Sequence, residues 1–359
     1  MNSCALIVGI NDYPVESGMS RLYGAVADAA DFADWALDPN GGAVPPQRLF
    51  FWTYPDPAAP SAHLANYLLA PTPWKMAGTP VRTRPPNFRD ISDTAFKLTQ
   101  DFARNGIERI YVFFAGHGVQ TVSLDVQRDP QICFITNDFV PGPPTNGLVP
   151  CDDLRRGLLA QGFSEVVMFL DCCRTPMNFN ETAPALGFPT SLVPDAPYGV
   201  GRAAKRGAKS FEAPEAAPTR GAFSQVLVEG LRRRRNDQNQ LTLNDLENYV
   251  CTGVERILGN GKQHPQFDIE PRNPPYYLLT GPATTLSLPI VVTFRTLAPG
   301  SLVQLTAHNG QLLDGPFAAG QAAVTLQAEA GTIYSLESPD HTFIKTFKHD
   351  GPGATHVEL

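Results

Sequence analysis

Two stretches of the sequence decide the fold: RIYVFFAGHG at residues 109–118 and EVVMFLDCCR at residues 165–174. Each begins with a short run of apolar, β-branched and aromatic residues and ends abruptly in glycine or polar residues. Such runs, without alternation, are typical of strands that are buried on both faces of a parallel sheet. A third run of this kind occupies residues 4–10, and residues 49–53 form a weaker fourth.

Helical patterns separate these predicted strands. They occupy residues 23–37, 93–104 and 153–160. Strands that alternate with helices predict an open, mostly parallel α/β sheet with right-handed crossovers. We also expect a short helix at residues 64–69, and a hairpin beside the sheet within residues 120–135.

The alternation of strands and helices stops after the second of the two deciding stretches. Residues 175–220 are rich in Pro, Ala, Gly and Asn, and a loop of that length is usually functional or mobile. Two amphipathic helices are predicted beyond it, at residues 222–233 and 243–258. Near the C-terminus, five strand-like runs separated by Gly, Pro, Asn and Asp predict a small β-sandwich. We therefore expect an α/β domain over residues 1–282 and a small all-β domain over residues 285–359.

Composition excludes several classes of protein. The chain has 359 residues, of which 43% are hydrophobic and 18% charged, and its net charge is −7. These values are typical of a soluble globular protein and disfavour general nucleic-acid binding. Neither a membrane span nor a signal peptide is apparent, so we expect a cytoplasmic protein without a membrane or nucleic-acid partner. The six cysteines have neither disulfide nor zinc spacing, which predicts reduced thiols.

A histidine and a cysteine directly follow the two central predicted strands. His117 stands between two glycines, and Cys173 is the second of two adjacent cysteines. Functional groups in an open α/β sheet gather at the carboxyl ends of the strands, so we expect the two residues to lie close together. A thiol nucleophile needs a base within reach, and this arrangement supplies one. Singly, His117 is also typical of a turn and Cys173 of a packed core, but their joint placement favours a catalytic pair.

The segments YVFFAGHG and VVMFLDCCR resemble the histidine and cysteine motifs of caspase-like peptidases, particularly metacaspases and orthocaspases. A histidine about fifty residues upstream of a cysteine that is followed by Arg fits the caspase spacing. The segments ALIVGINDY, RLYGAVADAADFADWAL, RGAFSQVLVEGL and QHPQF resemble further parts of the family, so the similarity extends over roughly residues 1–282. The resemblance implies a caspase-like open sheet and a cysteine endopeptidase activity.

The resemblance also implies roles for individual residues. Cys173 corresponds to the nucleophile and His117 to the catalytic histidine, whereas Cys172 is expected to be a packed neighbour. The backbone N–H groups of Gly118 and Cys173 correspond to the oxyanion hole, which stabilises charge in the tetrahedral state. We expect the neighbouring imidazolium to lower the pKa of the Cys173 thiol.

Two carboxylates are the candidates for substrate recognition. Metacaspases cleave after Arg or Lys, unlike animal caspases, and Asp28 and Asp171 stand at the positions of their substrate-binding aspartates. Two carboxylates in a narrow pocket suit a guanidinium or ammonium group and repel an acidic side chain. The expected partner is therefore a protein or peptide substrate with Arg or Lys at the cleavage site. Cleavage after Asp is the alternative, and Asp28 is also typical of an exposed helix charge.

No cofactor is expected to be required, and calcium is the one candidate cation. Asp138, Asp152 and Asp153 resemble part of the acidic cluster with which many metacaspases bind calcium, and carboxylate oxygens suit this ion. Asp152 and Asp153 are also typical of the N-terminus of a helix, where acidic side chains are favourable.

Regulation by proteolytic processing is expected, because the segment at residues 175–220 is long and contains basic residues. They are Arg202, Lys205, Arg206, Lys209 and Arg220. Either the chain itself or an upstream activating peptidase would make the cut, as in a zymogen.

The sequence leaves two alternatives to an active peptidase. The nucleophile is followed by Arg174, Thr175 and Pro176, whereas family members often continue Cys-His-Ser-Gly. This departure leaves open a catalytically silent caspase-like scaffold whose β domain binds a partner. A nucleotide-binding doubly wound domain is disfavoured, because GINDY and AGHG lack the multi-glycine phosphate fingerprint.

Overall fold

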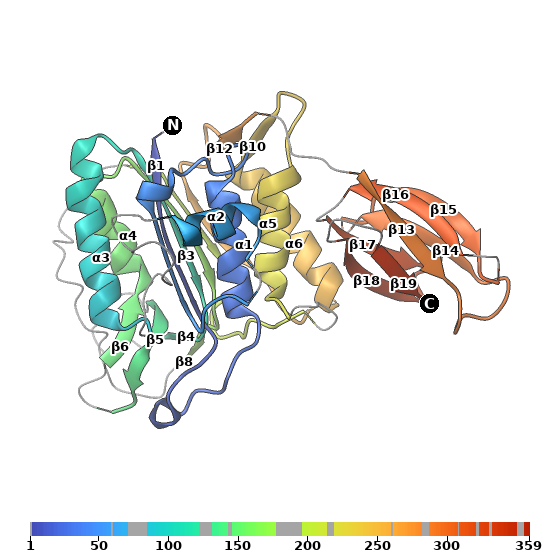
Figure 1. Ribbon diagram of the computed structural model, residues 1–359, viewed down its shortest axis with the longest axis horizontal. Coiled ribbons are helices and arrows are strands. Elements are labelled where there is room, and N and C mark those ends of the chain that lie inside the picture. The colour runs from blue at the N-terminus through green and yellow to red at the C-terminus, as the bar shows by residue number, and fades with distance from the viewer. Residues whose placement is uncertain are drawn as a thin grey trace.

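A six-stranded sheet forms the centre of the N-terminal part of the molecule (Figure 1). The computed structural model describes residues 2–58, 60–70, 85–121, 131–142, 146–176, 196–213, 219–259, 261–281, 287–307, 309–320, 323–329, 332–349 and 355–359. In order across the sheet, the strands are β11 (Gln266–Glu270), β9 (Tyr198–Arg202), β7 (Glu165–Asp171), β3 (Arg109–Ala115), β1 (Ser3–Ile10) and β2 (Leu49–Tyr54). All neighbouring strands are parallel except β9 and β11. The predicted open, mostly parallel sheet is confirmed.

Helices cover both faces of this sheet, which explains why its strands lack alternation. On one face lie α1 (Ala25–Leu37), α2 (Ala62–Leu69), α5 (Ala222–Arg233) and α6 (Leu243–Leu258), and on the other α3 (Phe88–Asp101) and α4 (Cys151–Ala160). In β1, Ala5 and Ile7 pack against the first group, whereas Leu6 and Val8 pack against the second. Both sets of side chains need to be apolar, because successive residues of a strand point to opposite faces. Within the described residues, no helix is both long and apolar enough to span a membrane.

Strand β9 corrects the expectation that residues 175–220 form one flexible loop. It lies inside the sheet between β7 and β11, and its sequence, YGVGR, contains two glycines. A methyl group at Gly199 would lie 2.2 Å from Cδ1 of Leu243, and one at Gly201 would lie 3.0 Å or less from atoms of two phenylalanine rings. The glycines therefore permit close packing in a central strand. Composition suggested a loop because it does not distinguish this use of glycine from flexibility.

Smaller sheets flank the central one. At the carboxyl edge, β6 (Asn146–Pro150), β5 (Ile132–Val140), β4 (Gly118–Gln120) and β8 (Thr175–Pro176) form one sheet, and elsewhere β10 (Gln240–Thr242) pairs with β12 (Tyr277–Thr280). Short 3₁₀ turns are η1 (Val15–Ser17), η2 (Pro46–Arg48) and η3 (Ala103–Asn105). The antiparallel pair β4 and β5 confirms the strands of the predicted hairpin. Its connection, residues 122–130, lies outside the described residues.

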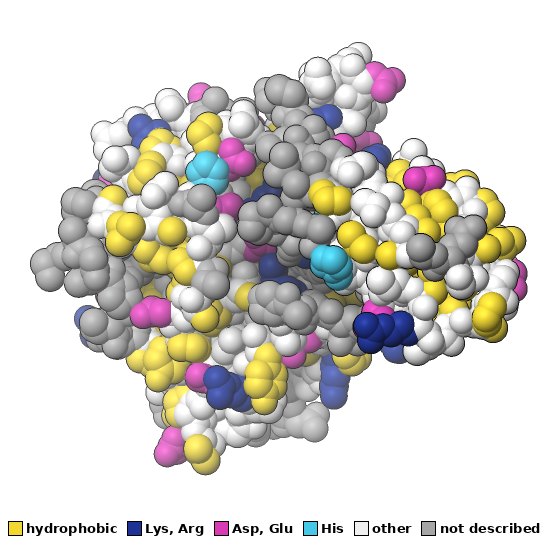
Figure 2. All heavy atoms as spheres, turned by 45° about the vertical axis from the view of Figure 1, so that its right-hand side comes forward, with side chains coloured by type: hydrophobic (Ala, Val, Ile, Leu, Met, Phe, Trp, Pro, Cys, Tyr) yellow, Lys and Arg dark blue, Asp and Glu magenta, His cyan; other side chains and the backbone are white. Residues whose placement is uncertain are grey.

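The C-terminal strands form two further sheets. The strands are β13 (Ser287–Thr293), β14 (Leu302–Ala307), β15 (Leu312–Ala318), β16 (Val324–Glu329), β17 (Thr332–Glu337), β18 (Ile344–His349) and β19 (Thr355–Glu358). One sheet has the order β16-β13-β19 and the other β15-β14-β17-β18, and buried apolar residues from both form one cluster. This β-sandwich agrees with the predicted fold class. Hydrophobic side chains gather on its surface in Figure 2, and its exposed large ones are Leu302, Leu312, Leu313 and Ile344.

The β-sandwich also packs against the helices of the N-terminal part. Ile333 in β17 is fully buried in the same apolar cluster as α5 and α6, and its N–H donates to Oε2 of Glu229 at 3.0 Å. Nη2 of Arg256 on α6 donates to Oε2 of Glu337 at 2.7 Å. The expected boundary between the domains falls at residues 282–286, which lie outside the described residues. Side-chain contacts thus join the two parts in addition to the connecting chain.

Candidate active site

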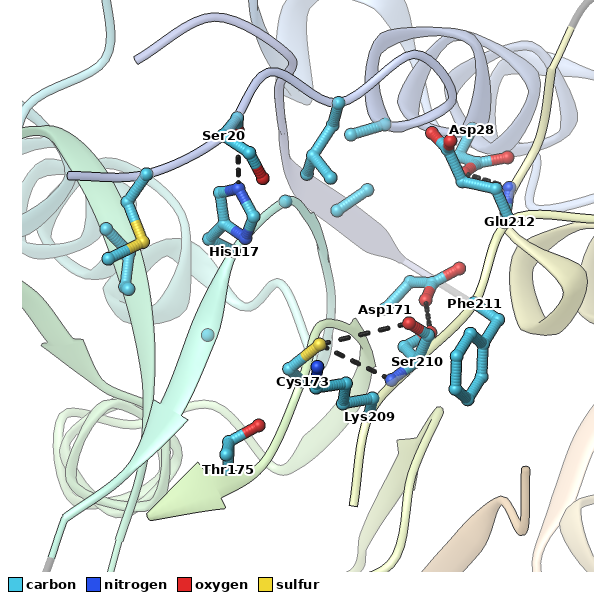
Figure 3. A pocket seen from close by; sticks show the side chains of 18 of the residues that line it. Ser20, Asp28, His117, Asp171, Cys173, Thr175, Lys209, Ser210, Phe211 and Glu212 are labelled. Atoms are coloured by element: carbon cyan, nitrogen blue, oxygen red, sulfur yellow. Dashed lines mark hydrogen bonds between the residues drawn. The ribbon is translucent and has the colours of Figure 1, made fainter. Parts of the chain in front are cut away.

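His117 and Cys173 line one cleft at the carboxyl edge of the central sheet, as the strand pattern predicted (Figure 3). They follow β3 and β7, which are adjacent and parallel with Ala115 opposite Asp171. His117 and Cys173 therefore each lie two residues beyond the paired positions Ala115 and Asp171, at the same edge of the sheet. The cleft has a volume of about 380 Å³. This volume suits a single large side chain and the backbone next to it.

The His117 ring is held by a backbone carbonyl. Its Nε2 lies 2.7 Å from the oxygen of Ser20, and because a carbonyl only accepts hydrogen bonds, Nε2 carries the proton. Nδ1 then carries the lone pair, and Figure 3 shows this nitrogen on the side of the ring that faces Cys173. The Tyr13 hydroxyl accepts the backbone N–H of His117 at 2.9 Å. Neither Ser20 nor Tyr13 was among the predicted site residues.

The Cys173 thiol contacts the segment that leads away from β9. Its Sγ lies 3.4 Å from the N–H of Ser210 and 3.9 Å from the carbonyl oxygen of the same residue. Burial raises the pKa of Cys173, although the Ser210 N–H acts in the opposite direction. Burial also disfavours the charged form of His117, and therefore lowers the pKa of the imidazole. The expected low thiol pKa is therefore wrong for the resting structure, in which a neutral thiol and a neutral imidazole are favoured.

This protonation state predicts how the reactivity of Cys173 depends on pH. A thiol whose pKa is raised gains thiolate only as the pH approaches that pKa, so alkylation by iodoacetamide should accelerate by about ten-fold per pH unit between pH 6 and 8. Mass spectrometry of the alkylated peptide measures this rate, with the half-buried Cys251 as an internal reference. A rate that is already constant above pH 6 would indicate a preformed thiolate–imidazolium pair instead.

The geometry around Gly118 leaves its backbone N–H free of the sheet ladder. Gly118 lies opposite Phe134 in the antiparallel ladder of β4 and β5, and the Ile135 N–H donates to the carbonyl of His117 at 2.9 Å. In such a ladder, this bond makes Gly118 and Phe134 a non-hydrogen-bonded pair, so the Gly118 N–H does not donate to β5. A methyl group at Gly118 would lie 2.6 Å from Sγ of Cys172 and 2.9 Å from the carbonyl oxygen of Cys173. Glycine thus brings the two backbones together, and Cys172 is buried as the packed neighbour. The oxyanion-hole role of the Gly118 and Cys173 N–H groups stays a prediction.

Asp171 lies in the wall of the same cleft, and serine residues orient its carboxylate. Oδ1 accepts the hydroxyl of Ser210 at 2.7 Å, and Oδ2 accepts the hydroxyl and the backbone N–H of Ser224 at 2.6 Å and 3.2 Å. Burial raises the pKa of Asp171, and these hydrogen bonds act against that rise. The two serines therefore fix the orientation of the Asp171 carboxylate.

Asp28 is the second carboxylate of the cleft, and at 2% exposure it is not an ordinary helix charge. Oδ1 accepts Nε of Arg220 at 2.6 Å, and Oδ2 accepts the N–H of Gly221 at 2.8 Å. Burial raises the pKa of Asp28 to about 7; Arg220 lowers it and Asp171 raises it. A methyl group at Gly221 would lie 2.2 Å from Asp171 and 2.8 Å from Asp28, so only glycine fits between the carboxylates.

The departure from the family motif after Cys173 affects the cleft through one residue, Thr175. Thr175 lines the cleft, whereas the Arg174 guanidinium donates to Oε1 of Gln266 at 2.7 Å and to Oε1 of Gln120 at 3.3 Å. Arg174 thus packs along the sheet edge and is not among the described residues that line the cleft.

The predicted calcium ligands do not come together. Asp152 pairs with Arg202 at 3.1 Å, and Asp153 accepts a hydrogen bond from Gln131 just before β5. Asp138 lies near the other end of β5, seven residues beyond Gln131, which corresponds to roughly 20 Å along a strand. Its Oδ1 accepts the N–H of Phe88 and the hydroxyl of Thr136. In the described part of the chain, no group of three or more acidic, His or Cys side chains suits a metal ion. These three carboxylates therefore do not form one cluster in the described part of the chain, and calcium binding stays a prediction.

Comparison with known proteins agrees with this fold. An open α/β sheet that carries a histidine and a cysteine at its carboxyl edge is the architecture expected of a caspase-like hydrolase. A family model described as the caspase domain matches residues 2–276. The chain therefore belongs to the caspase-domain family of peptidases.

Two individual proteins are similar to the chain. A protein from a Desulfuromonadales bacterium, described as a probable protease, is 28% identical over 242 residues. The match covers 66% of this chain and 26% of that protein, so the chain spans about a quarter of its length. A crystal structure of a Geobacter sulfurreducens protein has 14% identity and a TM-score of 0.45, over 75% of this chain and 93% of the other.

Proposed function

We propose that the chain is a cysteine endopeptidase that cleaves proteins after Arg or Lys, with Cys173 as the nucleophile and His117 as acid and base. One observation carries the proposal: both side chains line the same cleft as the two buried carboxylates, Asp28 and Asp171, in a chain of the caspase-domain family. A nucleophile, a base and a cation-binding wall are the parts that this reaction requires.

The reaction begins from the neutral pair. As Sγ of Cys173 attacks the scissile carbonyl carbon, Nδ1 of His117 takes the thiol proton, and the substrate oxygen becomes an oxyanion near the N–H groups of Gly118 and Cys173. The imidazolium then gives its proton to the leaving amine as the C–N bond breaks. Water attacks the resulting thioester, His117 accepts its proton, and the proton returns to the departing sulfur. Ser20 keeps the ring oriented throughout, because its carbonyl accepts from Nε2 in both protonation states.

Asp28 and Asp171 supply the specificity for a basic side chain. Each carboxylate oxygen has two lone pairs, and the internal partners of Asp28 and Asp171 leave some of them for the substrate. An Arg side chain can bridge both carboxylates with its planar fork, whereas Lys brings a point charge. An acidic substrate side chain would meet two buried carboxylates and is disfavoured.

Processing within residues 175–220 is part of the proposal, and two exposed basic residues at a turn support one position for a cut after a basic residue. Residues 177–195 and 214–218 lie outside the described residues and contain neither Lys nor Arg. Lys205 and Arg206 are exposed at a turn next to the cysteine-bearing loop. That turn is therefore the proposed cleavage point, whether the chain itself or an upstream activating peptidase makes the cut.

A panel of fluorogenic peptides that differ only in the residue before the scissile bond tests the proposal. Wild type should cleave the Arg and Lys peptides but not the Asp peptide, and it should cleave the peptide with citrulline, the neutral isostere of Arg, slowly but measurably. Cys173→Ala should abolish this activity, whereas Cys172→Ala, which changes the adjacent buried thiol, should retain it. Intact-mass analysis of the same preparations locates any cut near Lys205 and Arg206. Cleavage of the Asp peptide alone would contradict the proposed specificity, and no cleavage at all would favour the silent scaffold.

A further inference from the structure

Arg220 lies behind the specificity pocket and connects two carboxylates of helix α1. Its side chain is 7% exposed, and its guanidinium donates from Nε to Oδ1 of Asp28 at 2.6 Å and from Nη2 to Oδ2 of Asp31 at 2.8 Å. Asp28 faces the active-site cleft. Asp31 lies almost one turn further along α1 and borders a different hollow of about 290 Å³, which Arg220 also lines. Arg220 thus approaches Asp28 from the side away from the substrate cleft.

The two carboxylates depend on Arg220 to different degrees. Asp31 also meets Nη1 of Arg232 at 3.2 Å and Nζ of Lys348, from the β-sandwich, at 3.7 Å. For Asp28, Arg220 is the one cation in an ion pair within the described part of the chain. Removal of Arg220 would therefore leave Asp31 with two cations and Asp28 with none.

We propose that Arg220 is a specificity-determining residue: it favours the ionised form of Asp28 near neutral pH and fixes the Asp28 carboxylate, so that two carboxylates are ready to receive one basic side chain. The inference rests on the proposed function, since it assigns the preference for a basic substrate residue partly to Arg220. Two buried carboxylates without a counter-ion do not both remain ionised, because desolvation and mutual repulsion favour protonation of one. A protonated Asp28 would present a donor to a substrate group that itself only donates.

The shape of the guanidinium matters as well as its charge. Arg220 bonds two carboxylates at the same time through different nitrogens, and this fixes the Asp28 carboxylate while Gly221 holds its second oxygen. A lysine at position 220 would restore a charge but not the planar fork that spans both partners. Arg220→Lys should therefore give an intermediate phenotype.

Other charged groups near Asp28 set the background for its ionisation. Asp171 faces it from β7 and Arg220 from the segment before α5. Glu212 lies beside it, with its carboxylate on the N–H groups of Tyr23 and Gly24 just before α1 (Figure 3). Asp31 lies on its own helix, and Lys209, His117 and Cys173 line the same cleft. Arg220 lowers the pKa of Asp28, whereas burial and Asp171 raise it. Loss of Arg220 should raise this pKa further, so that the ionised form is reached only at higher pH.

Steady-state kinetics from pH 6 to 9 with the Arg and citrulline peptides test the inference in Arg220→Met and Arg220→Lys. The KM of the Arg peptide should rise about ten-fold at pH 6 and about five-fold at pH 7 in Arg220→Met, which corresponds to a rise of about one unit in the pKa of Asp28, and its fall with increasing pH should shift to higher pH. Arg220→Lys should shift less, and kcat should change little in either variant. The citrulline peptide, where it is turned over, should show no such shift.

Arg232→Met is the matched control. Arg232 pairs with Asp31 and Asp34 on the same helix but has no contact with Asp28 in the structure. Its loss should lower the melting temperature and leave the pH dependence of KM unchanged. If Arg220→Met does not fold, the double variant Asp28→Asn/Arg220→Met, which leaves no unpaired charge on Asp28, should show a KM without inflection in this range. Wild-type KM values and pH profiles in Arg220→Met and Arg220→Lys would overturn the inference.

Agmatine, a small guanidinium compound, separates this inference from the proposed activity. Its affinity for the Cys173→Ala chain can be measured by calorimetry with and without Arg220→Met, and no catalysis is needed. Weaker agmatine binding without Arg220, together with a wild type that cleaves none of the peptides, would support the inference and contradict the proposed activity. An affinity that does not depend on Arg220 would overturn the inference even if the wild type cleaves after Arg.

Discussion

Replacement of His117 by alanine is expected to lower kcat for cleavage of an Arg peptide by about 10³-fold, with little change in KM. The raised pKa of Cys173 means that the thiol needs a base during attack, and the leaving amine needs an acid afterwards. His117 is positioned for both steps, and its ring makes no contact with the carboxylates that would bind the substrate side chain. Steady-state kinetics on purified wild type and His117→Ala measure the effect.

His63→Ala is the control for this prediction. His63 is an exposed histidine on α2, outside the cleft, so its loss should leave both kinetic parameters unchanged. A His117→Ala variant that kept more than about a tenth of the wild-type kcat would show that another group, or water, performs the proton transfers.

Asp171→Asn should reduce kcat/KM for the Arg peptide by about 100-fold, mainly through KM. Asparagine keeps the shape of the side chain and can still accept the Ser224 N–H, but it removes the charge that faces the substrate guanidinium. The citrulline peptide carries no charge, so its turnover should hardly change. The ratio of kcat/KM for the Arg and citrulline peptides is therefore the measurement.

A surface aspartate provides the comparison for Asp171→Asn. Asp152 also forms an ion pair, with Arg202 on β9, but it does not line the cleft. Asp152→Asn should leave the Arg to citrulline ratio unchanged. An Asp171→Asn enzyme with an unaltered ratio would assign the recognition of basic residues to other groups in the cleft.

The sequence predicted the sheet and the placement of His117 and Cys173 in one cleft because both depend on local patterns. Apolar runs without alternation located β1, β3 and β7, and the polar residues after them marked the edge where His117 and Cys173 meet. Strand β9 was missed because its glycines make room for side chains from distant segments, such as Leu243, and a local sequence pattern does not record those contacts.

The remaining parts of the site depend on tertiary structure that no local pattern records. Ser20 contributes a backbone carbonyl, which any residue type could supply, so its identity carries no signal. Arg220 stood in a segment whose basic residues suggested a processing site, yet it is buried against α1. The acidic residues proposed for calcium were grouped by resemblance, and the length of β5 keeps Asp138 away from Asp153.

The contacts between the β-sandwich and α5 mean that the sandwich is not an independent module. Because Ile333 is buried in the same cluster as α5 and Glu229 accepts its backbone N–H, deletion of the sandwich would expose apolar surface and leave a buried carboxylate short of a partner. A truncated peptidase would therefore be a damaged protein and not a simplified one. A macromolecule that binds the sandwich and displaces it would also displace α5, and the first turn of α5 carries Ser224, whose hydroxyl donates to Asp171. The C-terminal part thus contacts the helix that positions Asp171 in the wall of the cleft.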